Sequence, residues 1–134
     1  SERKRAALEK ADVEVFTKCF LGSLYVWNDF SGEKLAREIA PYAEHQLVAK
    51  VVDGQVQKFA KELKGRRLAQ AITFVTVDVA EDHVTAHFDR VLKIEGIPVI
   101  IPTDVNLSMI QGDPTKLNPM GIYVSGITET SGGK

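Results

Sequence analysis

The spacing of apolar residues changes once along this chain, at about Ala69. Before that point, apolar side chains recur at steps of three and four residues, as they do at Val13, Phe16, Phe20, Leu24 and Trp27. Such a spacing places them in one stripe along an α-helix. Beyond Ala69, apolar and polar residues alternate, which is the pattern of a β-strand with one buried face. The sequence therefore predicts a helical first half followed by strands.

Three helices are expected in the first half. The first covers roughly residues 5–28, and the segment 28–32 breaks it. Ser31 can then cap a short helix at about 33–40. Pro41 suits the first turn of a third helix, whose apolar stripe ends at Gly65.

Four strands are expected in the second half, and short turns at residues 81–82 and 95–96 connect the first three. Pro98 and Pro102 cannot donate to a ladder, so the third strand should begin near an edge or carry a bulge. The last strand covers residues 122–128.

These elements give an α+β fold class, with N-terminal helices packed on one face of a curved four-stranded antiparallel sheet. A length of 134 residues is enough for one ordinary core without metal or disulfide support. We therefore expect a single domain over residues 1–134.

A turn of sequence Asn118-Pro119-Met120-Gly121 precedes the last strand. Asn118 can cap the turn with its own side chain, and Pro119 presets the backbone dihedral that the next turn position needs. Gly121 can take a positive φ at little cost, so we expect it in a positive-φ or tightly packed position. Turn chemistry alone indicates a loop that enters a strand.

This N-P-x-G turn, which follows a helical half and three strands, resembles the periplasmic domain of the TraE or VirB-eight family. That family supplies the bridging inner-membrane subunit of bacterial type IV secretion and conjugation machines. The similarity runs from about residue 12 to residue 129, and the segments 16–29, 39–47 and 58–64 look like the helices of the TraE branch.

The resemblance implies a non-enzymatic assembly factor and scaffold that self-associates and contacts other secretion subunits, linking the inner-membrane platform to the outer core channel. It places the domain in the periplasm. In this family the turn bears on association, so Asn118, Pro119, Met120 and Gly121 are the expected interaction residues. Family members normally carry an N-terminal transmembrane helix. The longest apolar run here, residues 97–101, is far short of the ~20 residues that span a bilayer, so we expect this chain to lack the anchor.

The charge of the chain gives no reason to expect a nucleic-acid partner. Its 17 basic and 18 acidic residues leave a net charge of −1, whereas nucleic-acid binding needs a concentrated basic surface. The basic cluster Lys61, Lys64, Arg66 and Arg67 is expected at a helix end, where it complements the helix macrodipole.

No cofactor, metal site or catalytic residue is predicted. His83 and His87 would lie ~13 Å apart along a strand, which is too far to share a metal ion. His45 is expected at the surface or as a cap residue near a helix start. Cys19, the single cysteine, cannot form an intramolecular disulfide and is expected to be a small buried hydrophobe.

An enzyme remains the alternative. Helices over a curved sheet also resemble the cone-shaped, nuclear-transport-factor-like superfamily, whose members include isomerases, dehydratases and scaffolds. A stand-alone enzyme or small-ligand-binding protein of that type would use a pocket residue such as Asp104, Asp78 or Tyr25. No acid–base pair is visible in the sequence, however. An interaction domain of another envelope system is the third possibility.

Overall fold

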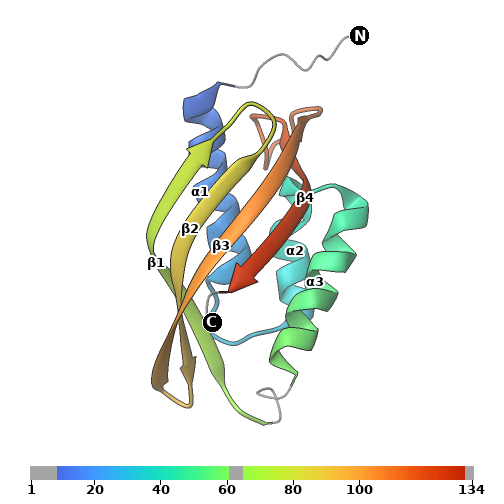
Figure 1. Ribbon diagram of the computed structural model, residues 1–134. Helices are drawn as coiled ribbons and strands as arrows, with labels where there is room; N and C mark the ends of the chain where they lie inside the picture. Colours follow the sequence, from blue (N-terminus) through green and yellow to red (C-terminus); the bar gives the residue numbers. More distant parts are fainter. Residues whose placement is uncertain (1–8, 61–64, 132–134) are drawn as a thin grey trace.

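Helices come first and strands follow in the computed structural model, which describes residues 9–60 and 65–131. The elements are α1 (Lys10–Tyr25), α2 (Gly32–Ile39), the 3-10 turn η1 (Ala40–Tyr42), α3 (His45–Phe59), β1 (Leu68–Val79), β2 (Val84–Ile94), β3 (Ile97–Gln111) and β4 (Ile122–Ser131). The strands form one antiparallel meander in the order β1-β2-β3-β4 (Figure 1). This arrangement confirms the expected α+β class.

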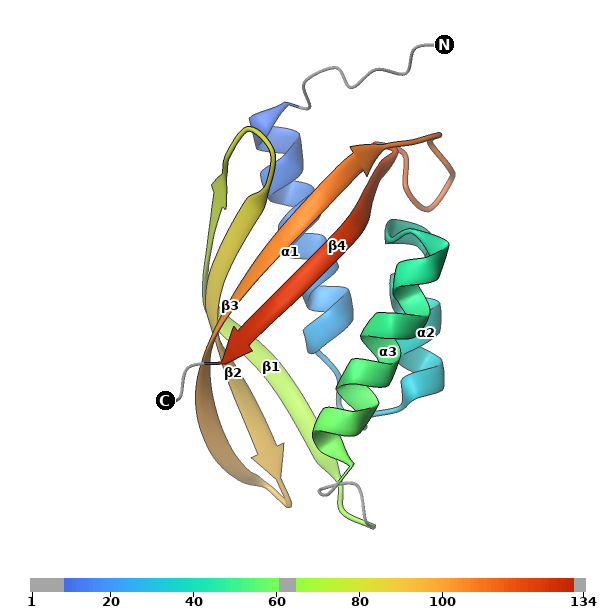
Figure 2. The same cartoon turned by 45° about the vertical axis from the view of Figure 1, so that its right-hand side comes forward.

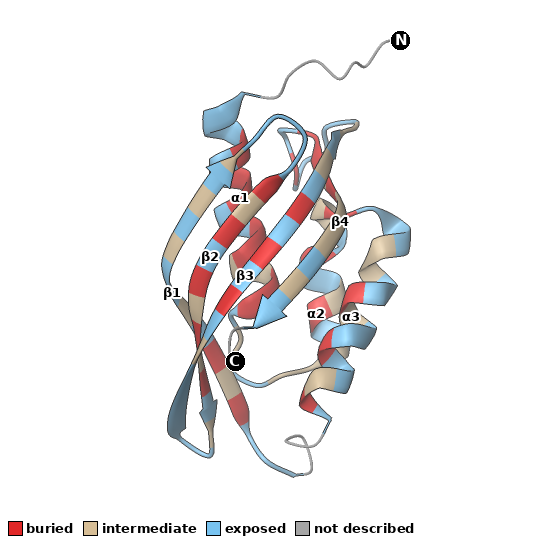
Figure 3. Cartoon of the chain, viewed as in Figure 1, coloured by how far each residue is buried: buried red, intermediate tan, exposed pale blue. Residues whose placement is uncertain are grey.

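The helices cover one face of the bent sheet, and the core lies between the two layers (Figure 2). Buried residues alternate along β2 and β3 (Figure 3), as the two-residue period predicted. Ala86 and Val105 from the sheet meet Phe20 and Leu24 from α1 in one apolar cluster. Burying each large apolar side chain stabilises the fold by about 1.5 to 3 kcal/mol. In the described ranges, no helix has the length and hydropathy needed to cross a membrane.

The first helix is shorter than its apolar stripe suggested. It ends at Tyr25, because Val26 adopts an extended conformation with φ −103 and ψ 113. Trp27 instead pairs with β1: its N–H donates to the Gln70 carbonyl oxygen over 3.1 Å, and the Gln70 N–H donates back over 2.8 Å. The expected residues 5–8 of this helix lie outside the described residues. Pairing with the sheet therefore overrides the helical spacing at Trp27.

The third helix begins later than predicted. Pro41 lies in η1, and α3 starts at His45. Between them, Ala43 forms an isolated bridge with Val124, and the Glu44 N–H donates to the Val124 carbonyl oxygen over 2.9 Å. This extended backbone at Ala43 separates the two helical segments. By contrast, the predicted cap of α2 is confirmed, since Ser31 Oγ accepts from the backbone N–H of Lys34.

The basic cluster does not cap α3. This helix ends at Phe59, whereas Arg66 and Arg67 lie in the exposed segment just before β1. Lys61 and Lys64 lie outside the described residues. The macrodipole explanation is therefore wrong for the two arginines, because the dipole acts only within the last turn of a helix.

Two irregularities bend the sheet. The β1–β2 register shifts between Thr73 and Thr76, and the β3–β4 register shifts between Ser108 and Met109. Phe74, at the first shift, has a φ of 54 and is 83% exposed. Bulges increase local twist and bend the bulged strand, which fits the curvature of this sheet.

The two prolines of β3 lie beside a free edge, as expected. In the described part of the chain, β4 pairs with β3 only from Thr103 onward. The β2–β3 turn contains Glu95 at φ 55 and Gly96 at φ 84, the combination of a two-residue type I′ hairpin. In an antiparallel ladder, the N–H and C=O groups of successive residues point alternately toward and away from the neighbouring strand. Those of Pro98, Ile100 and Pro102 therefore face away from β2. The prolines thus leave this edge short of N–H donors.

Candidate functional site

The N-P-x-G segment forms a tight turn at the entrance to β4. The Gly121 N–H donates to the Asn118 carbonyl oxygen over 3.1 Å, and the Gly112 N–H donates to the Gly121 carbonyl oxygen over 2.7 Å. Gly121 has a φ of +66, and a Cβ there would lie 2.7 Å from the Gly112 carbonyl oxygen. The expectation of a positive-φ, tightly packed glycine is confirmed.

Asn118 links this turn to the helical layer. Its side chain is 2% exposed, and its Nδ2 donates to the carbonyl oxygens of Pro41 over 3.0 Å and Ile122 over 2.8 Å. Two backbone hydrogen bonds with Thr115, of 3.0 and 3.2 Å, close the loop before it. The bond to Ile122 closes the turn with the Asn118 side chain, as expected, and the bond to Pro41 is an additional link to η1.

The four residues therefore divide into two pairs. Asn118 and Gly121 are buried and fix the backbone, whereas Pro119 and Met120 are exposed. Leu117, directly before the motif, is also exposed. Any contact with another protein at this turn would be made by the exposed residues, on a surface whose shape the buried pair holds.

A polar cluster between β4 and the helices was not anticipated from the sequence. Glu129 accepts from the Tyr25 hydroxyl over 2.6 Å, from Lys58 Nζ, and from Gln55 Nε2 over 3.4 Å. These donors come from α1 and α3, so one carboxylate holds the end of β4 to both helices. The cluster has a structural role in joining the layers.

The contacts around Glu129 shift the pKa values of three groups: those of Glu129 and Lys58 are lowered and that of Tyr25 is raised. Burial raises the pKa of Glu129. Hydrogen bonds from Lys58 and Tyr25 and the charges of Lys58 and Arg90 lower the pKa by a larger amount, so the net shift is downward. Burial, followed by the charge and hydrogen bond of Glu129, raises the pKa of Tyr25 well above its usual value. The carboxylate and the neutral phenol are thus the favoured forms. Lys58 keeps a lowered pKa, because loss of hydration outweighs its attraction to Glu129.

Arg90 is the second unanticipated residue. It is 3% exposed, and its guanidinium donates to Gln70 Oε1 over 2.9 Å, Thr103 Oγ1 over 3.0 Å and Ser131 Oγ over 3.0 Å. These hydrogen bonds offset the cost of burying the charge. The signal for Arg90 was present in the sequence, because it occupies an inward position in the alternation of β2.

The residues of the enzyme alternative do not share a pocket. Asp104 Oδ1 lies 2.7 Å from His87 Nδ1, and Asp78 Oδ2 lies 3.8 Å from His87 Nε2, all three on the exposed face of the sheet. Tyr25 is buried on the other face. The fold therefore separates the two candidate aspartates from Tyr25.

The remaining candidates are surface residues. His45 begins α3 and is exposed, as predicted, whereas His83 lies in the turn before β2 and not on a strand. Cys19 is exposed, contrary to expectation. A helix turns by about 100° per residue. Three residues after the buried Phe16, the side chain of Cys19 therefore lies outside the buried stripe of α1. Within residues 9–60 and 65–131, no group of three or more His, Cys, Asp or Glu side chains is placed to hold a metal ion.

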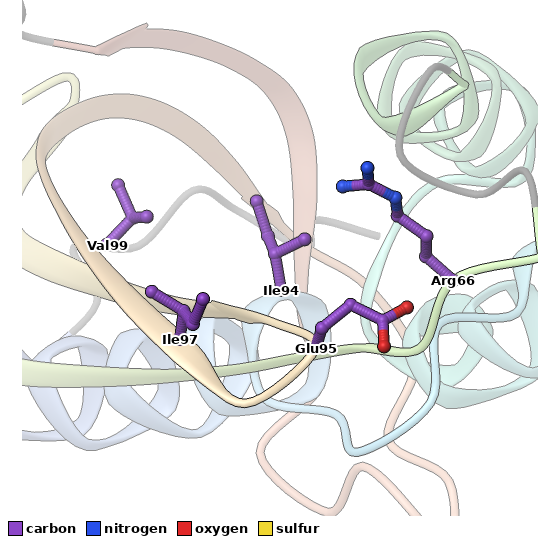
Figure 4. Close-up of a pocket in the computed structure, with 5 residues that line it drawn as sticks. All are labelled: Arg66, Ile94, Glu95, Ile97 and Val99. Carbon is purple, nitrogen blue, oxygen red and sulfur yellow. The ribbon is translucent and has the colours of Figure 1, made fainter.

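An apolar hollow of about 460 Å³ lies at the β2–β3 hairpin, lined by Arg66, Ile94, Glu95, Ile97 and Val99. Figure 4 shows the three apolar side chains on the hairpin and Arg66 extending from the segment before β1. The hollow lies beyond the part of the sheet that the helices cover, which explains why Ile97 and Val99 remain exposed.

Comparison by sequence finds no matching protein-family model and no matching curated protein. Solved structures do match. VirB8 of Agrobacterium tumefaciens has a TM-score of 0.68 at 13% identity, over 93% of this chain and 94% of that chain. A TrwG type IV secretion component from Bartonella birtlesii has a TM-score of 0.67 at 11% identity, over 92% and 93%. TraE in complex with 2-(2-furyl)isonicotinic acid has a TM-score of 0.65 at 10% identity, over 93% and 98%. The chain thus has the fold that the sequence resemblance implied.

Proposed function

We propose that this chain is the periplasmic domain of an inner-membrane subunit of a type IV secretion or conjugative transfer machine. In this role it is a non-enzymatic scaffold that contacts other secretion subunits. The observation that carries the proposal is the fold shared with VirB8, TrwG and TraE over nearly the whole length of each chain. Because one fold can serve many functions, the N-P-x-G turn provides the second, local argument.

The turn is suited to recognition because its shape is fixed before binding. Hydrogen bonds from the buried Asn118 amide hold it to η1 and to the start of β4, while Pro119 and Met120 stay exposed. A partner that binds a rigid turn does not have to order it, which reduces the entropic cost of association. We assign Pro119 and Met120 to the contact and Asn118 and Gly121 to its support.

The proposal includes an inner-membrane location, with an N-terminal transmembrane anchor outside residues 1–134 and this domain in the periplasm. An anchor confines each subunit near its partners and raises their effective concentration. A weak contact at the turn would then be sufficient for assembly. The upstream coding sequence tests this part directly, because it should encode an apolar helix of ~20 residues.

Gene deletion and complementation test the function. Deleting the full-length gene should abolish transfer of DNA or protein through the envelope. Anchored protein in which residues 118–121 are replaced by a flexible Gly/Ser turn should accumulate and fail to restore transfer. The matched control replaces Glu81 and Asp82, in the β1–β2 turn, with Gly and Ser and should restore it.

A second variant separates contact from support. Met120→Asp changes an exposed side chain and leaves the Asn118 hydrogen bonds in place, so it should fold normally and reduce transfer. Undiminished transfer by both the Gly/Ser variant and Met120→Asp would remove the turn from the mechanism. Undiminished transfer by the deletion strain would refute the secretion role itself.

A further inference from the structure

The inner face of the sheet becomes uncovered toward the β2–β3 hairpin. Along β3, every second residue lies on the face that the helices cover elsewhere. The exposed fraction of these side chains rises from 0% at Val105 to 41% at Val99 and 66% at Ile97. The uncovered residues are aliphatic, whereas a solvated sheet face normally carries polar residues. Exposed apolar surface of this kind marks interaction sites.

Three aliphatic side chains form one surface at this end of the sheet. Ile94 pairs with Ile97 across the β2–β3 ladder. Val99 pairs with the buried Leu92, so all four side chains point to the same face. Ile94 also packs against the small core cluster that contains Phe59, the last residue of α3. The hollow of about 460 Å³ is thus a continuation of the core past the end of the helical layer.

A strand is not a suitable partner for this surface. In the described part of the chain, β4 leaves the edge of β3 free before Thr103. Pro98 and Pro102 remove two of the three outward N–H donors from that edge, so an incoming strand would lack donors for its carbonyl oxygens. The aliphatic side chains lie on a face of the sheet, and the rest of the same face is covered by helices (Figure 2).

The dimensions of the surface match one helix. Ile97 and Val99 lie ~6.6 Å apart along β3 at ~3.3 Å per residue. Side chains four residues apart on a helix are separated by a similar distance, ~6 Å. Ile94 and Ile97 lie on neighbouring strands ~4.8 Å apart, which is less than the ~10 Å diameter of a helix with its side chains. A helix with apolar residues at positions i and i+4 can therefore cover this surface.

Two oppositely charged side chains border the hollow. Arg66 extends from the segment before β1, and Glu95 belongs to the β2–β3 turn (Figure 4). Neither side chain makes an ion pair or a hydrogen bond within residues 9–60 and 65–131. The Glu95 N–H donates to the Arg67 carbonyl oxygen over 3.3 Å and so links the two sides of the hollow. A carboxylate beside Arg66 and an ammonium group beside Glu95 would complete both pairs and fix the orientation of a bound helix.

We propose that this surface binds one amphipathic helix of another secretion subunit. The helix places apolar side chains at positions i and i+4 against Ile97 and Val99, with an acidic residue beside Arg66 and a basic residue beside Glu95. The inference rests on the proposed function only in taking the helix from another subunit of the machine. It adds a second contact surface, at the opposite end of the sheet from the N-P-x-G turn (Figure 1).

Titration with a designed helix tests the contact in the purified domain. The probe is an alanine-based peptide of ~18 residues, because shorter helices are marginal in water. It carries leucines at positions i and i+4, glutamate on one side of them and lysine on the other. Binding should shift the amide NMR signals of Ile94, Ile97 and Val99. A control peptide with the two leucines on opposite faces of the helix should bind at least ~10-fold more weakly, because it can bury only one of them.

Two variants of β3 separate the faces of the sheet. Ile97 and Ile100 are 66% and 64% exposed, but Ile100 pairs with Val91 on the face opposite the hollow. Ile97→Asp should weaken binding of the probe at least ~10-fold, whereas Ile100→Asp should bind it like the wild type. Melting curves establish that both are folded, and Val99→Asp replaces Ile97→Asp if the latter unfolds. Equal binding by the two variants, or no binding by the wild type at millimolar peptide, would overturn the inference.

A charge exchange tests the orientation of the helix. Arg66→Glu should reverse the preference of the domain between the probe and a second peptide in which the glutamates are replaced by lysines. The wild type should prefer the glutamate peptide because its carboxylates lie beside Arg66. An unchanged preference in Arg66→Glu would contradict the proposed contact.

Photo-crosslinking in cells identifies the natural partner. Anchored, full-length protein with a photoreactive phenylalanine analogue in place of Ile97 should cross-link to an amphipathic helix of another secretion subunit, and the same analogue in place of Ile100 should not. A cross-link to a second copy of this chain, or to an extended segment, would overturn the inference. Normal transfer by Ile97→Asp would reject this contact and leave the secretion role intact, whereas normal transfer after gene deletion would reject the secretion role and leave the peptide result standing.

Discussion

The side-chain amide of Asn118 donates to the carbonyl oxygen of Pro41 over 3.0 Å, joining residues that are 77 positions apart in the chain. The same Nδ2 donates to the Ile122 carbonyl oxygen over 2.8 Å. One buried amide thus connects the turn, the start of β4 and the helical layer. The position of the exposed Pro119 and Met120 depends on it.

Asn118→Ala should lower the free energy of unfolding by about 1 to 3 kcal/mol, because it leaves buried carbonyl oxygens without donors. Urea unfolding monitored by circular dichroism measures the loss. Lys116→Ala, an exposed change in the same loop, is the control and should stay within about 0.5 kcal/mol of the wild type. Equal stability of the two variants would show that the bridge to Pro41 contributes nothing.

The same chemical change should have opposite effects at two glycines. Gly121→Ala places a Cβ 2.7 Å from the Gly112 carbonyl oxygen at a φ of +66, which should cost about 1 to 3 kcal/mol; Gly121→Val should cost at least as much. Gly54→Ala lies in α3 with no atom within 4 Å of the new Cβ and should gain up to ~1 kcal/mol. Thermal melts of both variants show whether each change lowers or raises stability. A stabilised Gly121→Ala would contradict the structure.

Glu129 should make the free energy of unfolding depend on pH. Its pKa is lower in the folded protein than the unfolded value of 4.5, so its contribution is present above that pH and is lost as pH falls through the folded pKa. Glu129→Gln should therefore cost about 1 to 3 kcal/mol at pH 7, where charged hydrogen bonds are lost, and much less at pH 3. Urea titrations of wild type and variant at both pH values test this, and a gap that does not narrow at pH 3 would contradict it.

Glu95 occupies a conformation that disfavours it. At φ 55 it is the first residue of a type I′ turn, a position that asparagine fills more readily. Glu95→Asn should stabilise the protein by about 0.5 to 1 kcal/mol, because the short polar side chain of asparagine can hydrogen-bond to the nearby backbone and so favours the left-handed conformation more than glutamate does. The control is Glu81→Asn in the β1–β2 turn. Glu81 is not one of the described residues with a positive φ, so this variant should show no such gain in chemical denaturation.

Strand positions were predictable because each strand has one buried face. Alternation in β2 identified Val84, Ala86 and Phe88 as inward residues, and all three are buried. Helix ends were less predictable. Trp27 fits the apolar stripe of α1 yet pairs with Gln70, and Pro41 fits a helix start yet lies in η1, before the bridge at Ala43.

Cys19 shows the limit of reasoning from one neighbour. Its distance of three residues from Phe16 suggested burial, but the buried face of α1 is centred on Phe20 and Leu24. Cys19 falls outside that face. The rotation of the helix relative to the sheet had to be known before its exposure could be assigned.

The sequence by itself determined the order of the elements, the cap at Ser31 and the positive φ of Gly121, because each follows from a residue and its near neighbours. Only the tertiary structure decided that Asn118 reaches Pro41 and that Glu129 meets Tyr25 and Lys58. These features depend on the packing of distant segments against one another. Periodicity reports which face of an element is buried, and packing decides what that face meets.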